Sequence, residues 1–134
     1  AMAEVTCVYV DPGGEQPLGD PLNVEVSFTA VRNLDSVVWR LRFVADAIYT
    51  QHAVALAETA QTSYGCGAHV AKVAAPSGIC ADGIPVNVLE NIGFLEASLT
   101  DAAGAELVRT RLMTDVRRGP DGGELRRAVM DPCR

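Results

Sequence analysis

Residues 20–45 read DPLNVEVSFTAVRNLDSVVWRLRFVA, and this stretch decides the fold. Apolar and polar residues alternate along it in two consecutive runs, residues 22–30 and residues 37–44. Alternation with a period of two is typical of strands that have one buried and one solvated face. The polar segment VRNLD between the two runs is turn-forming. The stretch therefore predicts two neighbouring antiparallel strands, as in a β-sandwich.

Length and charge limit the class of protein. The chain has 134 residues, of which 49% are hydrophobic, which is enough for one folded domain with a single core. We expect one domain over residues 1–134, with its core in 3–116 and a polar C-terminal tail in 117–134. No apolar run approaches the roughly 20 residues that cross a bilayer, so no membrane span is expected. The net charge of -6 disfavours direct binding to nucleic acid.

The four cysteines indicate no metal site. Cys7, Cys66, Cys80 and Cys133 form no Cys-x-x-Cys pair, so a zinc knuckle is not expected. Their even number permits disulfides, but a domain of this size folds without them. The prediction is that the cysteines are reduced, as in cytosolic and nuclear proteins.

The remaining segments predict short elements joined by loops rich in Gly and Pro. Seven or eight short strands are typical of an all-β fold, here an immunoglobulin-like β-sandwich with short helical turns in its loops. The expected elements are strands over residues 5–10, near 54–58 and over 69–75, a helical turn over 86–91, a hairpin over 92–116 and a short terminal helix over 124–130. The segment 46–62, which includes the strand near 54–58, is rich in alanine and also fits a helix.

The hairpin over residues 92–116 has an unusual outward face. Its turn contains Gly104, which can adopt a positive φ. Solvated strand faces usually carry small polar or charged residues, whereas here apolar residues surround two arginines. Such a surface is typical of a binding site. The alternative is an ordinary surface on which the arginines pair with the glutamate. The outward residues are Phe94, Glu96, Ser98, Leu107, Arg109, Arg111 and Met113.

No arrangement of residues indicates catalysis, a metal or a cofactor. The segment Cys66-Gly67-Ala68-His69 has half the spacing of a metal site, but no second Cys/His pair follows it. A Cys66 nucleophile would also need an orienting acid and an oxyanion hole. We therefore expect His69 to be a sheet residue or turn anchor, Trp39 to be a core residue, and Arg126-Arg127 to be solvated charges of the tail.

Several short motifs resemble, in order and spacing, the anti-silencing-function (ASF) family of histone chaperones, which bind the histone H3–H4 dimer. The resemblance spans nearly all of the chain at low identity. The motifs are Asp20-Pro21 before a strand that ends in Phe28, the Asn33-Leu34 step, Trp39 within an alternating strand, Gly67-Ala68-His69 at the start of a strand, the hairpin signature Gly104-Ala105-Glu106-Leu107-Val108-Arg109, and Glu124-Leu125-Arg126.

The resemblance implies a concave sheet face that receives an H3 helix around a pivotal arginine and tyrosine. The arginine corresponds to Arg109, and the tyrosine corresponds to Met113, which retains apolar volume without the hydroxyl. The family's valine after the Trp strand corresponds to Val44. A further valine of the hairpin corresponds to Glu96 or to Leu95, depending on the length of the turn. Alternation favours Glu96, because the other register would bury a carboxylate.

The chain also departs from the family at its acidic positions. An aspartate that pairs with a histone lysine corresponds to a position near Ala53, and Asp46 or Glu58 are the nearby acids that could replace it. An acidic pair that helps to hold peptides of downstream chaperones is half retained, with Asp35 at one position and Ser36 at the other. These departures make a second, peptide-binding groove doubtful.

The resemblance therefore predicts a nuclear histone chaperone, able to shuttle with the cytoplasm, that acts in nucleosome assembly and disassembly without a cofactor. It would be a monomer that binds the H3–H4 dimer, and other chaperones would add to it as strands. Its partner-binding residues would be Val44, Phe94, Glu96, Arg109, Arg111 and Met113. The alternatives are a non-histone adaptor on the same sandwich and, with less support, a lipid-binding sandwich with an internal cavity.

Overall fold

The computed structural model describes residues 2–46, 51–79, 84–90, 92–120 and 122–130. Within these ranges it contains ten strands and one short helix. The strands are β1 (Ala3–Asp11), β2 (Glu15–Pro17), β3 (Leu22–Ala30), β4 (Leu34–Asp46), β5 (Gln51–Glu58), β6 (Thr62–Tyr64), β7 (Gly67–Ala75), β8 (Ile92–Thr100), β9 (Glu106–Arg118) and β10 (Leu125–Val129), and the helix is α1 (Val86–Leu89).

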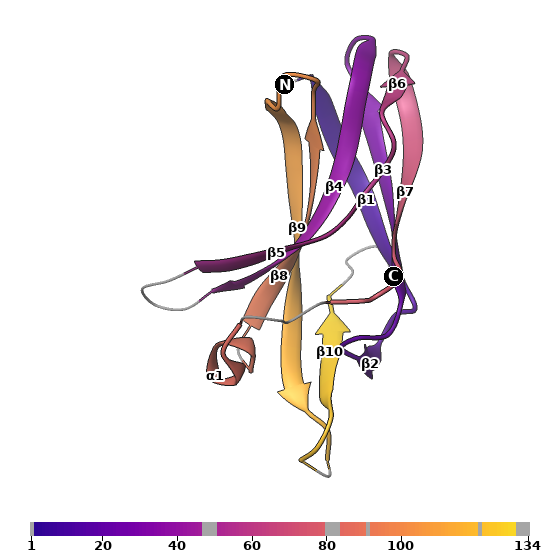
Figure 1. The fold of residues 1–134 in the computed structure, drawn as a ribbon. Helices are drawn as coiled ribbons and strands as arrows, with labels where there is room; N and C mark the ends of the chain where they lie inside the picture. The colour runs from indigo at the N-terminus through magenta and orange to yellow at the C-terminus, as the bar shows by residue number, and fades with distance from the viewer. Residues whose placement is uncertain (1, 47–50, 80–83, 91, 121, 131–134) are drawn as a thin grey trace.

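The strands form two antiparallel sheets that pack face to face (Figure 1). The smaller sheet has the order β1-β3-β7, and the larger has the order β2-β10-β9-β8-β4-β5, with β6 pairing to β4. The prediction of an all-β sandwich is therefore confirmed, whereas its immunoglobulin-like character stays a prediction. The one helix among the described residues has four residues, and no helix there is long and apolar enough to cross a membrane.

The core lies between the two sheets and follows the predicted alternation. In β3 the side chains from Leu22 to Ala30 are buried at every second position. On the facing strand β4, Trp39 is completely buried and its ring meets that of Phe28 edge-on, with centroids 5.2 Å apart. The expectation that Trp39 is a core residue is confirmed. Strand β4 pairs with β8 on one side and with β5 on the other. Its register therefore determines which outward side chains of these three strands are neighbours on the larger sheet.

The first strand is irregular. A bulge between Val5 and Cys7 shifts the register of β1 against β3, so the side chains on either side of it do not share one alternation.

The structure corrects the expectation for the cysteines. Cys7 is disulfide-bonded, and the prediction of a reduced thiol is wrong there. Cys66 is exposed and free, as expected. Cys80 and Cys133 lie outside the described residues.

The predicted strands over 54–58 and 69–75 are confirmed by β5 and β7, and the helical turn by α1, with Asn91 outside the described residues. Two short strands, β2 and β6, lie in segments for which no strand was expected.

The C-terminal helix predicted over residues 124–130 is wrong. This segment contains β10, which pairs with the end of β9 on one side and with β2 on the other. Arg127 of β10 is buried rather than solvated, and its Nη1 donates to the carbonyl oxygens of Pro17, Leu18 and Asp20 at 3.1, 2.9 and 2.7 Å. These bonds tie the tail to the end of β2 and to the loop before β3, so this part of the tail belongs to the folded sandwich.

Candidate functional site

The β8–β9 hairpin has the register that the alternation predicted. Glu96 lies opposite Arg111, Phe94 opposite Met113, and Ser98 opposite Arg109. All six side chains therefore lie on the same, outward face of the larger sheet, because directly paired residues share a face. This confirms the predicted outward face of the hairpin, and the arginines pair with Glu96, as the alternative of an ordinary surface expected. Which of Glu96 and Leu95 corresponds to the family's valine stays a prediction.

The turn of this hairpin explains why the register is well defined. The Oδ1 of Asp101 accepts hydrogen bonds from the backbone N–H groups of Ala103 and Ala105, at 3.0 and 2.9 Å. Gly104 adopts φ = 86°, a conformation that L-residues with a side chain rarely adopt. The turn thereby fixes the row of side chains that crosses the sheet at Glu96.

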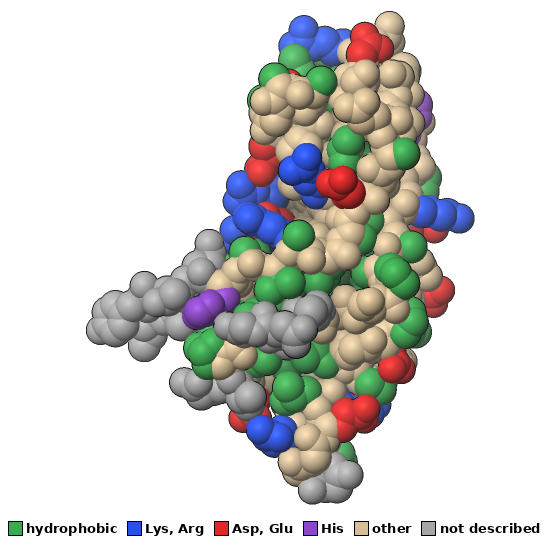
Figure 2. Space-filling view, in the orientation of Figure 1, with side chains coloured by type: hydrophobic (Ala, Val, Ile, Leu, Met, Phe, Trp, Pro, Cys, Tyr) green, Lys and Arg blue, Asp and Glu red, His purple; other side chains and the backbone are tan. Residues whose placement is uncertain are grey.

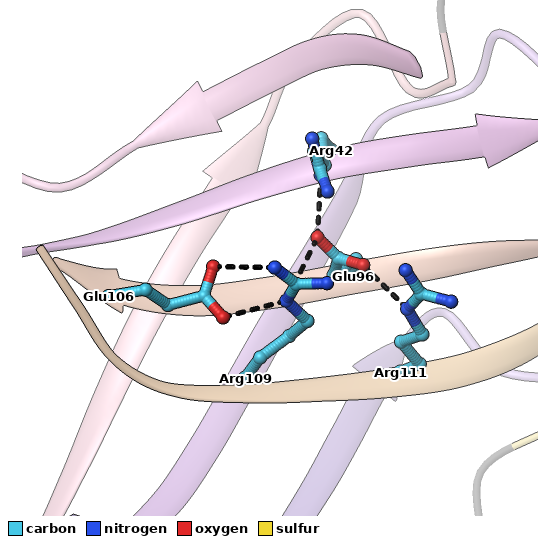
Figure 3. A network of polar contacts seen from close by, with 5 residues as sticks. All are labelled: Arg42, Glu96, Glu106, Arg109 and Arg111. Carbon is cyan, nitrogen blue, oxygen red and sulfur yellow. Dashed lines mark hydrogen bonds and ion pairs between the residues drawn. The ribbon is translucent and has the colours of Figure 1, made fainter. Parts of the chain in front are cut away.

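Glu96 is the centre of a network of five side chains, called here the Glu96 network: Arg42, Glu96, Glu106, Arg109 and Arg111 (Figure 3). Although Glu96 is on the outward face, its side chain is only 1% exposed, because the arginines cover it. The Nε of Arg42 donates to Oε1 at 2.5 Å, and the Nε of Arg111 donates to Oε2 at 2.6 Å. A carboxylate that is removed from water is tolerated only with such partners.

The electrostatics of Glu96 follow from this arrangement. Burial alone raises the pKa of the Glu96 carboxyl, but hydrogen bonds from Arg42 and Arg111, with the charges of Arg42 and Arg109, lower it more. The net pKa lies below the ordinary value, so Glu96 is ionised at neutral pH. The network therefore combines three cations with two carboxylates and carries a net positive charge, in a chain that is acidic overall.

Arg109 and Arg111 differ in their surroundings. Arg109 donates its Nε and Nη2 to the two oxygens of Glu106, at 2.8 and 2.9 Å, and its Nε lies 3.7 Å from Glu96 Oε1. Arg111 lies over the ring of Phe94, with its guanidinium carbon 5.4 Å from the ring centroid, which is a cation–π contact. Met113, which is 40% exposed, is the outward apolar residue next to Arg111 along β9 and opposite Phe94 on β8.

The structure buries two of the predicted partner-binding residues, Glu96 and also Val44. Val44 belongs to β4. It pairs with Phe94 across the sheet, and β4 alternates so that Val44 is on the outward face. Its exposure is nevertheless 0%, so it presents no surface to a partner in this conformation. An outward position in an alternating strand does not ensure accessibility, because other segments can cover the sheet.

A cleft of about 550 Å³ lies on the outward face beside the network. Its walls include Arg40, Arg42 and Arg109, and Glu58 of β5 pairs with Arg40 across 3.4 Å. Figure 2 shows basic and acidic side chains grouped where β5 leaves the rest of the sheet, with hydrophobic side chains gathered below them. The cleft and the Glu96 network form a mixed surface of charged and apolar groups.

Sequence reasoning missed Arg42 and Glu106 as members of this site. Arg42 is visible as an outward residue of the alternating β4 run, but its contact with Glu96 depends on the pairing of β4 with β8. Glu106 was quoted only as part of a motif. The cross-strand row of Arg42, Glu96 and Arg111 cannot be recognised from the sequence unless it is already known that β8 lies between β4 and β9.

The other residues considered earlier lie elsewhere. Ala53 of β5 is exposed and pairs with Val44, and the side chain of Asp46 is outside the described part of the structure. His69 is a residue of β7 whose Nε2 donates to the carbonyl oxygen of Gly65 at 2.6 Å, which confirms the expected anchor role. Among the described residues, no group of three or more His, Cys, Asp or Glu side chains could hold a metal ion.

The comparisons with known proteins do not narrow this site further. The chain matches none of the protein families and none of the curated proteins with which it was compared.

Proposed function

We propose that this protein is a histone chaperone that binds the H3–H4 dimer through the outward face of the β8–β9 hairpin and acts in nucleosome assembly and disassembly. It would act in the nucleus as a monomer, by binding alone and without a cofactor. The proposal rests on the resemblance of the sequence motifs to the ASF family. The observation that supports it most is that Arg109 is exposed on the same sheet face as Met113 and Phe94, with Arg111 between Arg109 and Met113 along β9.

The binding would combine apolar and charged contacts. Met113 and Phe94 offer apolar surface to one side of a helix, which is the helix-in-groove mode of recognition. Arg109 offers a charge-assisted hydrogen bond to an acid or carbonyl of that helix. Val44, which the resemblance also assigns to this contact, is buried, so the apolar contact falls to the hairpin. Charge complementarity with a basic histone dimer comes from the acidic chain as a whole, with its net charge of -6.

Selectivity between histone dimers tests this function. The protein is titrated by calorimetry with the H3–H4 dimer and, separately, with the other core-histone dimer, which contains neither H3 nor H4, at the same ionic strength. A chaperone of this kind binds H3–H4 and leaves the other dimer unbound or bound much more weakly. Equal binding of both dimers would indicate unspecific attraction to basic proteins, and failure to bind H3–H4 would exclude the proposal.

A second candidate is a non-histone, protein-binding adaptor on the same sandwich, and the disulfide at Cys7 favours it. Disulfides persist in oxidising compartments and are rare in cytosolic and nuclear proteins. A protein that keeps this disulfide would meet partners other than nuclear histones. Thiol quantification of the protein purified under native conditions, without reductant, separates the two: a nuclear chaperone has a reduced Cys7, and the adaptor an oxidised one.

A further inference from the structure

The cleft on the outward face lies over a cross-strand row of side chains of unequal length. Ser98 of β8 pairs with Arg109 of β9 on one side and with Arg40 of β4 on the other. The two arginine side chains are exposed, whereas Ser98 between them is buried. Because directly paired residues share a face, a short side chain between two long ones leaves a hollow. Thr100, the next cleft residue along β8, is also short, so the cleft lies over Ser98 and Thr100.

The side of the cleft that β5 forms is apolar. Ala55 pairs with Arg42 and Ala57 pairs with Leu41, so Leu56 between them is the extra residue of a bulge. A bulge re-aims the side chain of its extra residue relative to the regular alternation, and Leu56 lines the cleft. Ala55 is exposed, and Leu56 and Ala57 are half-buried. Apolar surface is therefore accessible along this side of the cleft.

The charged walls of the cleft are already paired. Each of the three arginines that line it has a carboxylate partner, with nitrogen–oxygen distances of 3.4, 2.5 and 2.8 Å: Arg40 with Glu58, Arg42 with Glu96, and Arg109 with Glu106. A charged group that enters the cleft has to compete with one of these pairs. An apolar side chain leaves all three pairs intact, and covering the apolar surface of β5 favours its binding. The walls and the floor of the cleft therefore favour an uncharged, apolar occupant.

The cleft is continuous with the face that the proposed function uses. Arg109, to which the polar contact is assigned, is a wall of the cleft. Along β8, Ser98 is four residues from Phe94, a distance of roughly 13 Å in an extended strand. On an α-helix the residues at i+7 and i+11 lie on the same side as residue i, roughly 10.5 and 16.5 Å along the axis. A helix that lies along β8 and contacts Phe94 and Met113 therefore reaches the cleft with the same apolar stripe.

We propose that the cleft receives an apolar side chain of the helix that Met113 and Phe94 contact, two or three turns further along that helix. This proposal rests on the proposed function and adds a sequence requirement for the bound helix, namely apolar residues at i and at i+7 or i+11. Arg109 keeps its polar contact with the same helix, at the wall of the cleft. An apolar anchor inside a polar rim is typical of the residues that contribute most to binding.

The first part of the test needs no histone. Three fluorescently labelled helical peptides of identical composition carry two leucines, which are seven, eleven or five residues apart, and binding is measured by fluorescence anisotropy at constant ionic strength. At the spacing of five, the second leucine lies on the other side of the helix. The better of the first two peptides is expected to bind roughly tenfold or more tightly than the third, because its second leucine is buried in the cleft.

The variant Ala55→Trp fills the cleft from its apolar side. It is expected to remove the difference in affinity between the three peptides. Equal affinities of the three peptides for the unmodified protein, or a difference that persists in Ala55→Trp, would overturn the proposal.

The second part measures the affinity for the H3–H4 dimer by calorimetry. Ala55→Trp and Ser98→Leu fill the cleft, and Ala74→Trp, at an exposed position of β7 on the other sheet, is the matched control. Thermal unfolding first confirms that each variant is folded. We expect roughly a tenfold or greater loss for the cleft variants and less than about a twofold change for the control.

The outcomes separate the cleft from the proposed function. Unchanged affinity in a folded cleft variant, or an equal loss in the control, would refute the role of the cleft and leave the proposed function standing. If the unmodified protein does not bind H3–H4, the proposed function is wrong, and the three peptides then decide whether the cleft receives the apolar side chain of a helix.

Discussion

Replacing Glu96 with Gln is expected to destabilise the fold by about 2 kcal/mol, although the residue lies on an outward face. Gln has nearly the same shape, so the change leaves no cavity. It replaces one carboxylate oxygen by an NH₂ group, which then faces an arginine Nε–H, and two donors cannot bond to each other. The remaining oxygen accepts from one arginine without the charge that strengthened the bond.

The magnitude follows from the contacts. Hydrogen bonds to charged groups contribute roughly 1.5–3 kcal/mol each, and Glu96 accepts two of them. This stabilisation is partly offset by the desolvation cost of the buried carboxylate, and most of that cost is absent in the neutral Gln variant. Removing one partner of a fully buried pair costs about 3–5 kcal/mol. Here the arginines are 36–40% exposed and can be rehydrated, so about 1–3 kcal/mol is the expected range.

Urea denaturation at pH 7 measures the free energy of unfolding of both proteins. Glu106→Gln is the matched control, since it removes another carboxylate from the same network, at an exposed position. Its expected cost is below about 1 kcal/mol, as for other surface ion pairs. If Glu96→Gln costs no more than Glu106→Gln, the buried carboxylate does not hold the network together and the reasoning is refuted.

Three further changes test the fold and the electrostatics. Gly78→Ala should destabilise far more than Gly122→Ala: both glycines have positive φ (61° and 74°), but a Cβ at Gly78 would lie 2.3 Å from the carbonyl oxygen of Asp20, whereas at Gly122 nothing lies within 4 Å; equal shifts in Tm would contradict this packing. Arg127→Met should cost about 3 kcal/mol, because it removes the donor of four carbonyl oxygens, of which only those of Pro17 and Leu18 also accept from a backbone N–H. Arg126→Met, at a partly exposed position, should cost less than about 1 kcal/mol, and similar urea midpoints for the two variants would show that β10 does not depend on the buried guanidinium. The pKa of the Glu96 carboxyl is lowered in the folded state, so its ionised form stabilises the fold fully above the ordinary pKa of 4.5, and this stabilisation is lost as the pH falls through the lowered value. The difference in the free energy of unfolding between the unmodified protein and Glu96→Gln should therefore shrink below about pH 4.5. A constant difference down to about pH 2 would refute this coupling.

Local pattern was sufficient where one strand face is buried. The alternation in residues 22–30 and 37–44 predicted β3 and β4, and the same rule predicted which hairpin residues are outward. The C-terminal segment was mispredicted because ELRRAVM has no alternation of its own. Its strand is stabilised by pairing with β9 and by the bonds of Arg127, both of which are tertiary. The burial of Val44 depends in the same way on segments that a strand pattern does not reveal.

The site was predicted in part for a related reason. A glutamate and two arginines on one hairpin face can be read from the sequence, and so can the choice of register that places them there. The third arginine of the network, Arg42, comes from β4, and the cross-strand row that it completes depends on strand order. The disulfide at Cys7 has no local signal either, since it depends on which thiols the fold brings together.

The most direct test of the central claim, that the outward face of the β8–β9 hairpin binds the H3–H4 dimer, compares an apolar residue on each sheet. Met113 is 40% exposed on this face, and Val70 is 55% exposed on β7 of the other sheet. Calorimetric titration of H3–H4 should give the unmodified affinity for Val70→Glu and roughly a tenfold or greater loss for Met113→Glu, whose charge would lie within the contact. Unchanged affinity in Met113→Glu, or an equal loss in both variants, would contradict the account.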